Sequence, residues 1–206
     1  MSPLSLRAVI WDLGGVLVRT EDLSSRERLA KRLGTTRLAL EELVFTSDSG
    51  QRLQLGKLTE QQHWENVACS LNIEGDELEQ FQADFWAGDR LDDRLVDFIR
   101  SLRPDYKTGL LSNHFPDLRR ALREEWKIED AFDAIVISAE VGLLKPDPQI
   151  YWLALNRLHV TPAEAVFIDD FGRNLAGAEA IGLRTIHFSS ADQVRSELKR
   201  LLAGDQ

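Results

Sequence analysis

The order of strand and helix signals constrains the fold of this chain more than any other feature of its 206 residues. From about residue 90 onward, short apolar runs typical of buried strands alternate with segments of helical spacing. We expect strands at residues 107–111, 134–137, 165–168 and 184–188, and helices near residues 92–102, 117–125, 149–158 and 174–181, with a last helix opened by Ser190. This alternation predicts βαβ units and therefore a parallel sheet with helices on both faces.

One further strand signal lies far from the others, at residues 6–11. It ends at Asp12 and is followed by Gly14-Gly15, which favours a break in regular structure. Residues 21–88 show helical patterns and no strand signal, and Thr59 with Gln62 forms a capping box at the start of one helix. The sequence therefore predicts a helical insert between the first strand and the rest of the sheet.

Charge and composition exclude several classes of function. The chain has 25 basic and 34 acidic residues, and this net charge of −9 argues against a protein that mainly binds nucleic acid or an anionic membrane. The single cysteine, Cys69, excludes an internal disulfide and a cysteine zinc site, and we expect it to be a small buried residue. No run approaches the ~18 apolar residues that span a bilayer, and the N-terminus lacks the pattern of a signal peptide. We therefore expect a soluble protein in a reducing cytoplasm.

Polar residues follow four of the predicted strands. Ligands of open parallel sheets bind at the carboxyl ends of the strands, where these residues should meet. They are Asp12, the pair Ser112-Asn113, Lys145 a few residues beyond the third strand in chain order, and the pair Asp169-Asp170. Three neighbouring carboxylates repel one another and attract a hard divalent cation such as Mg²⁺, which usually binds one or two carboxylates together with substrate phosphate. The hydroxyl, amide and lysine suit the other phosphate oxygens, and a carboxylate can attack phosphorus to form an acyl-phosphate.

Four segments in order carry a resemblance to a known family: residues 9–17 (VIWDLGGVL), 110–113 (LLSN), 142–151 (GLLKPDPQIY) and 166–174 (VFIDDFGRN). Together they resemble the four motifs of the haloacid dehalogenase-like (HAD) hydrolase superfamily. The last two are most similar to the phosphatase domain at the N-terminus of soluble epoxide hydrolases and to bacterial glucose-1-phosphate phosphatases. The resemblance covers nearly the whole chain. It implies an α/β fold, a Rossmann-like three-layer core of residues 1–17 and 89–206, with a small helical cap domain of residues 18–88.

The resemblance also implies an activity, that of an Mg²⁺-dependent phosphomonoesterase for a small phosphorylated metabolite such as a sugar phosphate. Asp12 would be the nucleophile that becomes aspartyl-phosphate. Lys145 would neutralise charge on the nucleophile and, with Ser112 and the Asn113 backbone, hold the phosphate. The implied metal ligands are Asp12, Asp169, Asp170 and the backbone carbonyl of Gly14. The expected partner is this metabolite, with no nucleic acid and no membrane, and the sequence gives no oligomeric state.

One position departs from the family pattern. Many phosphatases of the superfamily have an aspartate two residues after the nucleophile as general acid and base, where this chain has Gly14. Such help is typically worth ~10²–10⁴-fold, so we expect a preference for good leaving groups such as anomeric sugar phosphates or aryl phosphates. His114 could contact the substrate. Two alternatives stay open: a catalytically weak binding or regulatory protein with this fold, and a 2-haloacid dehalogenase, which needs no Mg²⁺.

Overall fold

Five parallel strands form the central sheet of the structure, a computed structural model that describes residues 6–203. In chain order they are β1 (Ala8–Trp11), β4 (Lys107–Ser112), β5 (Ala134–Ile137), β6 (Ala165–Asp169) and β7 (Arg184–His187). The order across the sheet is β5-β4-β1-β6-β7. β1 is central, and Trp11 pairs with Leu110 of β4 and Ile168 of β6. The parallel sheet and its five strands are confirmed.

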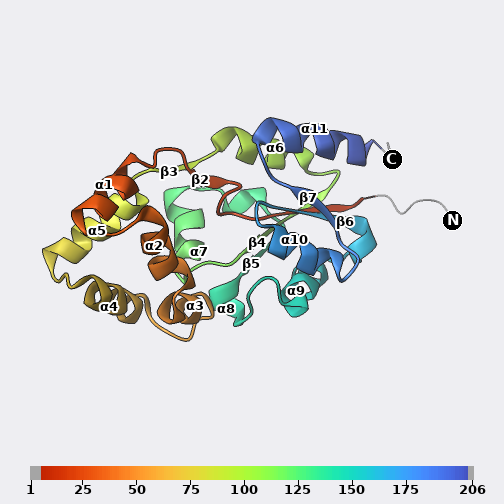
Figure 1. The fold of residues 1–206 in the computed structure, drawn as a ribbon. Helices are drawn as coiled ribbons and strands as arrows, with labels where there is room; N and C mark the ends of the chain where they lie inside the picture. Colours follow the sequence, from red (N-terminus) through yellow and green to blue (C-terminus); the bar gives the residue numbers. More distant parts are fainter. Residues whose placement is uncertain (1–5, 204–206) are drawn as a thin grey trace.

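Helices cover both faces of this sheet, which gives three layers (Figure 1). Along β1, Val9 and Trp11 belong to one apolar cluster, whereas Ala8 and Ile10 belong to another, because successive side chains of a strand point to opposite faces. The first cluster includes side chains of α6 (Asp93–Leu102) and α11 (Ala191–Leu202). The second includes side chains of α9 (Pro148–Leu158) and α10 (Gly172–Glu179). The fold is therefore the expected Rossmann-like α/β arrangement.

Shorter elements connect these strands and helices. They are α7 (Leu118–Arg120), the π-helix η2 (Ala121–Glu125), the 3₁₀ helix η3 (Glu129–Ala131), α8 (Ser138–Val141) and the 3₁₀ helix η4 (Pro162–Glu164). The expected helix at residues 117–125 thus consists of α7 followed by η2.

The segment between β1 and β4 is helical, as predicted. It contains α1 (Ser24–Arg32), α2 (Arg37–Glu41), the π-helix η1 (Glu42–Thr46), α3 (Asp48–Gln54), α4 (Glu60–Leu71) and α5 (Asp76–Trp86). Figure 1 shows these helices side by side at one end of the molecule, beyond the sheet. Thr59 and Gln62 form the expected capping box of α4. Apart from Phe115, the buried side chains of the third apolar cluster come from this insert, so the insert has an apolar core of its own.

A second, two-stranded sheet lies where the chain enters and leaves the insert. β2 (Val18–Thr20) pairs antiparallel with β3 (Asp89–Leu91), with Arg19 opposite Arg90. These strands were not predicted from the sequence, because three residues that are at most half-buried are too few to show a period of two. The expected boundary between a cap of residues 18–88 and a core of residues 1–17 and 89–206 places β2 in the cap and β3 in the core. This domain division stays a proposal.

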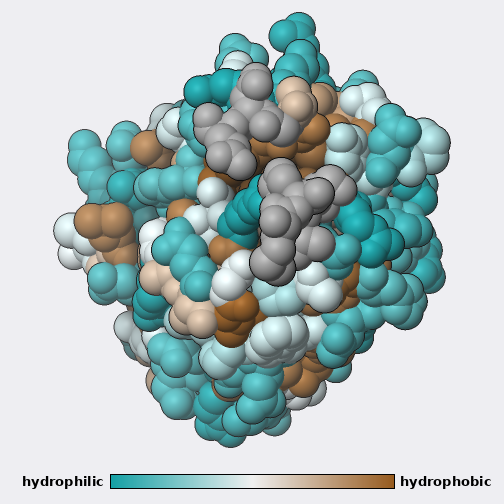
Figure 2. All heavy atoms as spheres, turned by 90° about the vertical axis from the view of Figure 1, so that its right-hand side faces the viewer, coloured by the Kyte–Doolittle hydropathy of each residue, from teal (hydrophilic) through white to brown (hydrophobic). Residues whose placement is uncertain are grey.

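Two surface features complete the description. Cys69 is exposed, so the expectation that it is buried is wrong. α4 buries the side of the helix that carries His63 and Val67, and Cys69 lies on the opposite side. Figure 2 views the molecule from the right-hand side of Figure 1, and in the visible part of this face hydrophilic residues separate small apolar groups. No helix among residues 6–203 is long and apolar enough to cross a membrane.

Candidate active site

Asp12 lies directly after β1, at the carboxyl edge of the sheet, and is 7% exposed. Its backbone N–H donates to the carbonyl of Ile168 on the neighbouring strand at 2.9 Å. Its carboxylate atom Oδ1 accepts a hydrogen bond from the Leu13 N–H at 2.7 Å and contacts the ammonium group of Lys145 at 2.8 Å. The central strand and two donors therefore fix the place of this carboxylate.

Lys145 comes from the loop between α8 and α9 and is almost completely buried. Its Nζ lies 2.8 Å from Asp12 Oδ1 and 2.7 Å from Asp169 Oδ2. The Asn113 side chain holds the Lys145 backbone through two hydrogen bonds, accepting from the Lys145 N–H at 2.8 Å and donating to the Lys145 carbonyl at 3.0 Å. Asn113 thus orients the loop that carries the lysine.

Asp169, the last residue of β6, is fully buried. Besides Lys145, it accepts hydrogen bonds from the Phe171 N–H at 2.7 Å and from the side-chain amide of Asn174 at 3.1 Å to each oxygen. Asp170 is half-buried, and its backbone carbonyl is hydrogen-bonded to the His187 ring at 2.9 Å. One carboxylate oxygen from each of Asp12, Asp169 and Asp170 lies within 4.8 Å of the other two.

The electrostatics of this cluster show an excess of negative charge, three carboxylates against one ammonium group. Burial, partly opposed by Lys145 and reinforced by Asp169, raises the pKa of Asp12 to about 7. Burial and the neighbouring Asp169 also raise the pKa of Asp170. Burial opposes the charged form of Lys145, but attraction to Asp12 and Asp169 outweighs it and raises the pKa of the ammonium group. The site therefore keeps its lysine protonated and favours a further cation.

Two glycines after Asp12 differ in what they allow. Gly15 has a φ of +75°, and a Cβ added there would lie 2.0 Å from Oδ2 of Asp170. Only a residue without a side chain lets the backbone pass so close to this carboxylate. At Gly14, by contrast, no atom lies within 4 Å of the place that a Cβ would take, and φ is not positive. A side chain at position 14 would therefore fit sterically.

The segment after β4 provides the other expected polar groups. Ser112, the last residue of β4, is 2% exposed and pairs with Ile137 of β5. Residues 113–115 have no regular secondary structure. The His114 N–H donates to the Ser138 hydroxyl at 2.9 Å, and burial lowers the pKa of the His114 imidazole. The half-buried His114 side chain has its Nδ1 3.5 Å from the Phe115 carbonyl.

The structure thus brings Asp12, Lys145, Asp169 and Asp170 together, with Asn113 bonded to the same lysine.

Two supporting residues were not predicted from the sequence. They are Asn174, which holds Asp169, and Tyr151, whose hydroxyl donates to the Asn174 carbonyl at 2.7 Å. Both residues end segments that resemble the family, residues 142–151 and 166–174, but the resemblance assigned neither a role. Their contact joins two helices and leaves no local pattern. The guanidinium of Arg19 in β2 is paired with Asp92 at 2.8 Å.

This arrangement can perform a limited set of reactions. A buried carboxylate held beside a protonated lysine is suited to nucleophilic attack on an electrophilic substrate. Three carboxylates within reach of one ion form an oxygen-rich site of the kind that hard divalent cations prefer. The geometry therefore fits metal-assisted covalent catalysis at Asp12.

Comparison with known proteins agrees with this chemistry. The family model of haloacid dehalogenase-like hydrolases matches residues 6–182. The chain is 26% identical to a sesquiterpene phosphatase of Aspergillus oryzae, over 96% of this chain and 97% of that protein. It is 27% identical to a D-ribitol-5-phosphate phosphatase of Bacteroides thetaiotaomicron, over 96% and 98%. It is also 27% identical to the mouse bifunctional epoxide hydrolase 2, over 96% of this chain but only 39% of that longer protein.

Solved structures show the same fold. A HAD-like family hydrolase from Porphyromonas gingivalis has a TM-score of 0.76 and 26% identity, covering 96% of this chain and 98% of that one. A HAD family enzyme from Bacteroides thetaiotaomicron, in complex with magnesium and inorganic phosphate, has a TM-score of 0.74 and 22% identity, covering 90% and 95%. Because the family model spans most of the sequence and the fold agrees, this chain belongs to the haloacid dehalogenase-like hydrolases.

Proposed function

We propose that this protein is an Mg²⁺-dependent phosphomonoesterase that transfers the phosphoryl group of a small organic phosphate to Asp12 and then releases it to water. The observation that carries the proposal is the cluster in which the carboxylates of Asp12, Asp169 and Asp170 meet the single ammonium group of Lys145. Its charge is unbalanced without a bound cation. The carboxylates would hold a divalent cation, and this cation together with Lys145 would hold a phosphate.

The residues present fit Mg²⁺. This ion prefers oxygen ligands and usually binds one or two carboxylates together with substrate phosphate. Asp12 and Asp170 would be direct ligands together with the Gly14 carbonyl, and Asp169 would bind through water or orient the site. When bound, the ion would neutralise negative charge on the phosphate and the carboxylates. The raised pKa values of Asp12 and Asp170 support this assignment, because they show that the folded protein disfavours these charges.

In the proposed reaction, the Asp12 carboxylate attacks phosphorus and the alkoxide or phenoxide of the substrate leaves. Lys145 holds Asp12 in place and offers its positive charge to the phosphate oxygens. The Ser112 hydroxyl and the backbone N–H after it would donate hydrogen bonds to the same oxygens. Water then hydrolyses the aspartyl-phosphate. No aspartate follows two residues after Asp12, so the leaving group departs without acid help from position 14.

The helical insert supplies the second half of the proposed site. It is attached close to Asp12, because β2 begins only six residues after Asp12 and leads directly into its helices. An insert in this place would cover the bound phosphate and exclude water from the reaction. Two relatives that the chain matches along nearly their full length are named as phosphatases, one for a sesquiterpene and one for a sugar-alcohol phosphate. They support phosphate monoesters as the substrate class and leave the organic group open.

Hydrolysis of p-nitrophenyl phosphate tests the proposal, because this substrate has a good leaving group and depends least on acid catalysis. We expect activity with Mg²⁺, none with EDTA, and a loss of at least about 10⁴-fold for Asp12→Asn, since the amide is no nucleophile. A control is Asp93→Asn, an exposed carboxylate outside the site, which should keep native activity.

Two outcomes would contradict this function. Release of halide from 2-haloacids without Mg²⁺, and no phosphatase activity, would identify a dehalogenase. If the native protein and Asp12→Asn hydrolyse p-nitrophenyl phosphate and a panel of sugar phosphates at the same low rate, the result would favour a binding protein.

A further inference from the structure

One residue of the α/β core lies inside the apolar cluster of the insert. Phe115 follows Ser112 by three residues, yet its buried side chain belongs to the cluster that otherwise contains buried residues of α1 through α5. Its ring centroid lies 6.2 Å from that of Phe45 in η1, 5.6 Å from that of His63 in α4 and 6.5 Å from that of Trp86 in α5. Three separate elements of the insert therefore surround this single side chain.

His63 contributes to this contact as a neutral group. It is fully buried, its Nδ1 is hydrogen-bonded to the Ser49 hydroxyl at 2.9 Å, and its Nε2 has no polar partner among the described residues. Burial lowers the pKa of the imidazole. The ring thus packs against Phe115 as an apolar aromatic surface.

The backbone beside Phe115 depends on side-chain contacts for its position. Ser112 ends β4, and residues 113–115 then leave the sheet without regular structure. Asn113 is fixed by the Lys145 backbone, and the Ser138 hydroxyl is bonded to both the N–H and the carbonyl of His114, at 2.9 and 3.2 Å. These two contacts hold the segment from the core, and the Phe115 ring holds it from the insert.

We propose that Phe115 is a positioning residue, through which the helical insert sets the place of the Ser112–Asn113 segment in the active site. This inference rests on the proposed function, because it gives that segment the task of holding phosphate. It adds that the insert acts on the phosphate through the core loop as well as by covering the site. A shift of the insert moves Phe115 and, with it, the backbone that follows Ser112.

The test compares two buried phenylalanines of the same cluster. Phe115→Leu loosens the contact between the loop and the insert, whereas Phe81→Leu removes another buried ring, which stacks on Phe85 within α5 and has no ring contact with Phe115. We expect Phe115→Leu to lower kcat/KM for p-nitrophenyl phosphate by about 10–100-fold, since displacements near 1 Å have effects of this size. The inhibition constant for inorganic phosphate should rise in the same variant, because the phosphate is held less well. Phe81→Leu should lower the Tm similarly and keep both constants close to native. Phe115→Met, whose unbranched side chain reaches further than that of leucine and whose sulfur packs favourably against aromatic rings, should restore most of the loss.

Hydrogen exchange provides a second measurement that needs no enzymatic activity. The amides of residues 112–115 should exchange at least about tenfold faster in Phe115→Leu than in the native protein, and at native rates in Phe81→Leu. A native phosphate inhibition constant and native exchange in Phe115→Leu would overturn the inference, leaving Phe115 as apolar filling. Lack of phosphatase activity in the native protein would instead contradict the proposed function, while the exchange rates would still decide whether Phe115 links the insert to the loop.

Discussion

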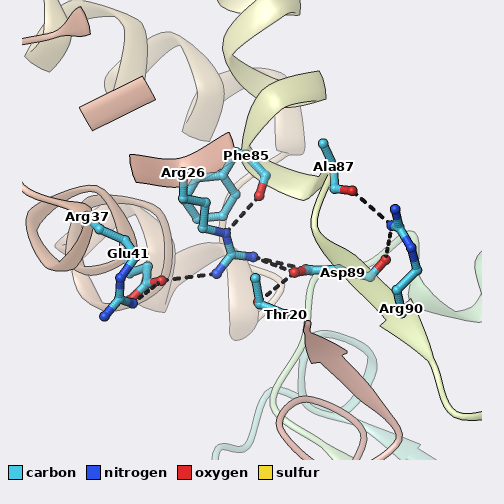
Figure 3. Close-up of polar contacts among 8 residues, drawn as sticks. All are labelled: Thr20, Arg26, Arg37, Glu41, Phe85, Ala87, Asp89 and Arg90. Carbon is cyan, nitrogen blue, oxygen red and sulfur yellow. Dashed lines mark hydrogen bonds and ion pairs between the residues drawn. The ribbon is translucent and has the colours of Figure 1, made fainter. Parts of the chain in front are cut away.

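Two networks of charged side chains lie largely inside this protein, and they differ in their charge balance. In the active site, three carboxylates share one ammonium group. At the base of the insert, Arg26 and Arg37 face Asp89 and Glu41, which makes two positive and two negative charges (Figure 3). With every carboxylate ionised, the first network carries an excess of two negative charges, whereas the second is neutral.

In the neutral network, every nitrogen of the central guanidinium group has a hydrogen-bond acceptor. The Arg26 side chain is buried, and each of its guanidinium nitrogens donates: Nε to the Phe85 carbonyl at 2.8 Å, Nη1 to Glu41 at 3.1 Å and Nη2 to both oxygens of Asp89. Thr20 of β2 also donates to Asp89 of β3 at 2.6 Å, so the network joins both strands that flank the insert. Figure 3 shows Arg26 between Glu41 and Asp89. Such a network is complete without a ligand.

Charge balance thus separates structural from functional buried charge. Burying a charge is costly unless it is paired and hydrogen-bonded, so a balanced network is consistent with a purely structural role. An unbalanced one, here with an excess of carboxylates, stores unfavourable energy that a bound cation can relieve, and perturbed pKa values accompany it. We expect the two networks to respond differently to substitution, pH and metal, most strongly at their central cations.

Removing the central cation of each network should have opposite consequences. Lys145→Met should lower kcat/KM by at least about 10³-fold, because the phosphate and Asp12 lose their positive partner. Arg26→Met should lower the free energy of unfolding by about 2–4 kcal/mol, because it leaves half-buried carboxylates unpaired, and should change kcat little. Urea unfolding and steady-state kinetics below the unfolding transition measure both effects. An Arg26→Met protein that is stably folded but inactive would contradict the structural assignment.

The two glycines after Asp12 should respond differently to substitution. Gly15→Ala places a methyl group against the Asp170 carboxylate at a positive φ, and we expect a loss of about 10²-fold in kcat/KM. Gly14→Asp has room for its side chain, should stay active on p-nitrophenyl phosphate, and should gain most on alkyl phosphates with poor leaving groups. An unchanged ratio of rates on poor and good leaving groups would show that position 14 does not control leaving-group preference.

The charge excess should also appear in the pH dependence of stability without metal. The pKa of Asp12 rises from 3.8 to about 7 on folding, so the folded state binds more protons between these values. Stability should therefore fall as the pH rises from about 4 to about 7, by on the order of 1–3 kcal/mol from this group. Urea unfolding in EDTA at pH 5 and pH 7 should show a smaller decrease for Asp12→Asn than for the native protein.

Adding Mg²⁺ at pH 7 provides the counterpart of that experiment. At 100 times its dissociation constant, the ion should stabilise the native protein by about 2.7 kcal/mol. Asp12→Asn should gain less. Equal pH slopes for the two proteins in EDTA, together with equal gains from Mg²⁺, would contradict the view that Asp12 carries the charge excess.

Much of this site could be predicted because its residues follow strands. Asp12, Ser112 and Asp169 end or directly follow parallel strands, and the carboxyl ends of such strands meet at one edge. Lys145 was expected at the same edge, and its contacts with Asp12 and Asp169 agree with that expectation. The role of Asn113 as a support for Lys145 was not predicted, because an amide that binds a backbone 32 residues away leaves no local pattern.

Local patterns in the sequence were enough to specify the layers of this protein, the helical nature of the insert and the edge of the sheet that carries the carboxylates. These features arise from apolar periodicity, capping residues and glycine, which act over a few neighbouring positions. Only the folded chain shows that Arg26 and Thr20 meet at Asp89 and that Phe115 packs inside the insert. The same is true of the close approach of Asp170 to the backbone of Gly15. Each of these contacts joins residues far apart in the chain, and they form because burial forces distant polar and aromatic groups to find partners in the folded interior.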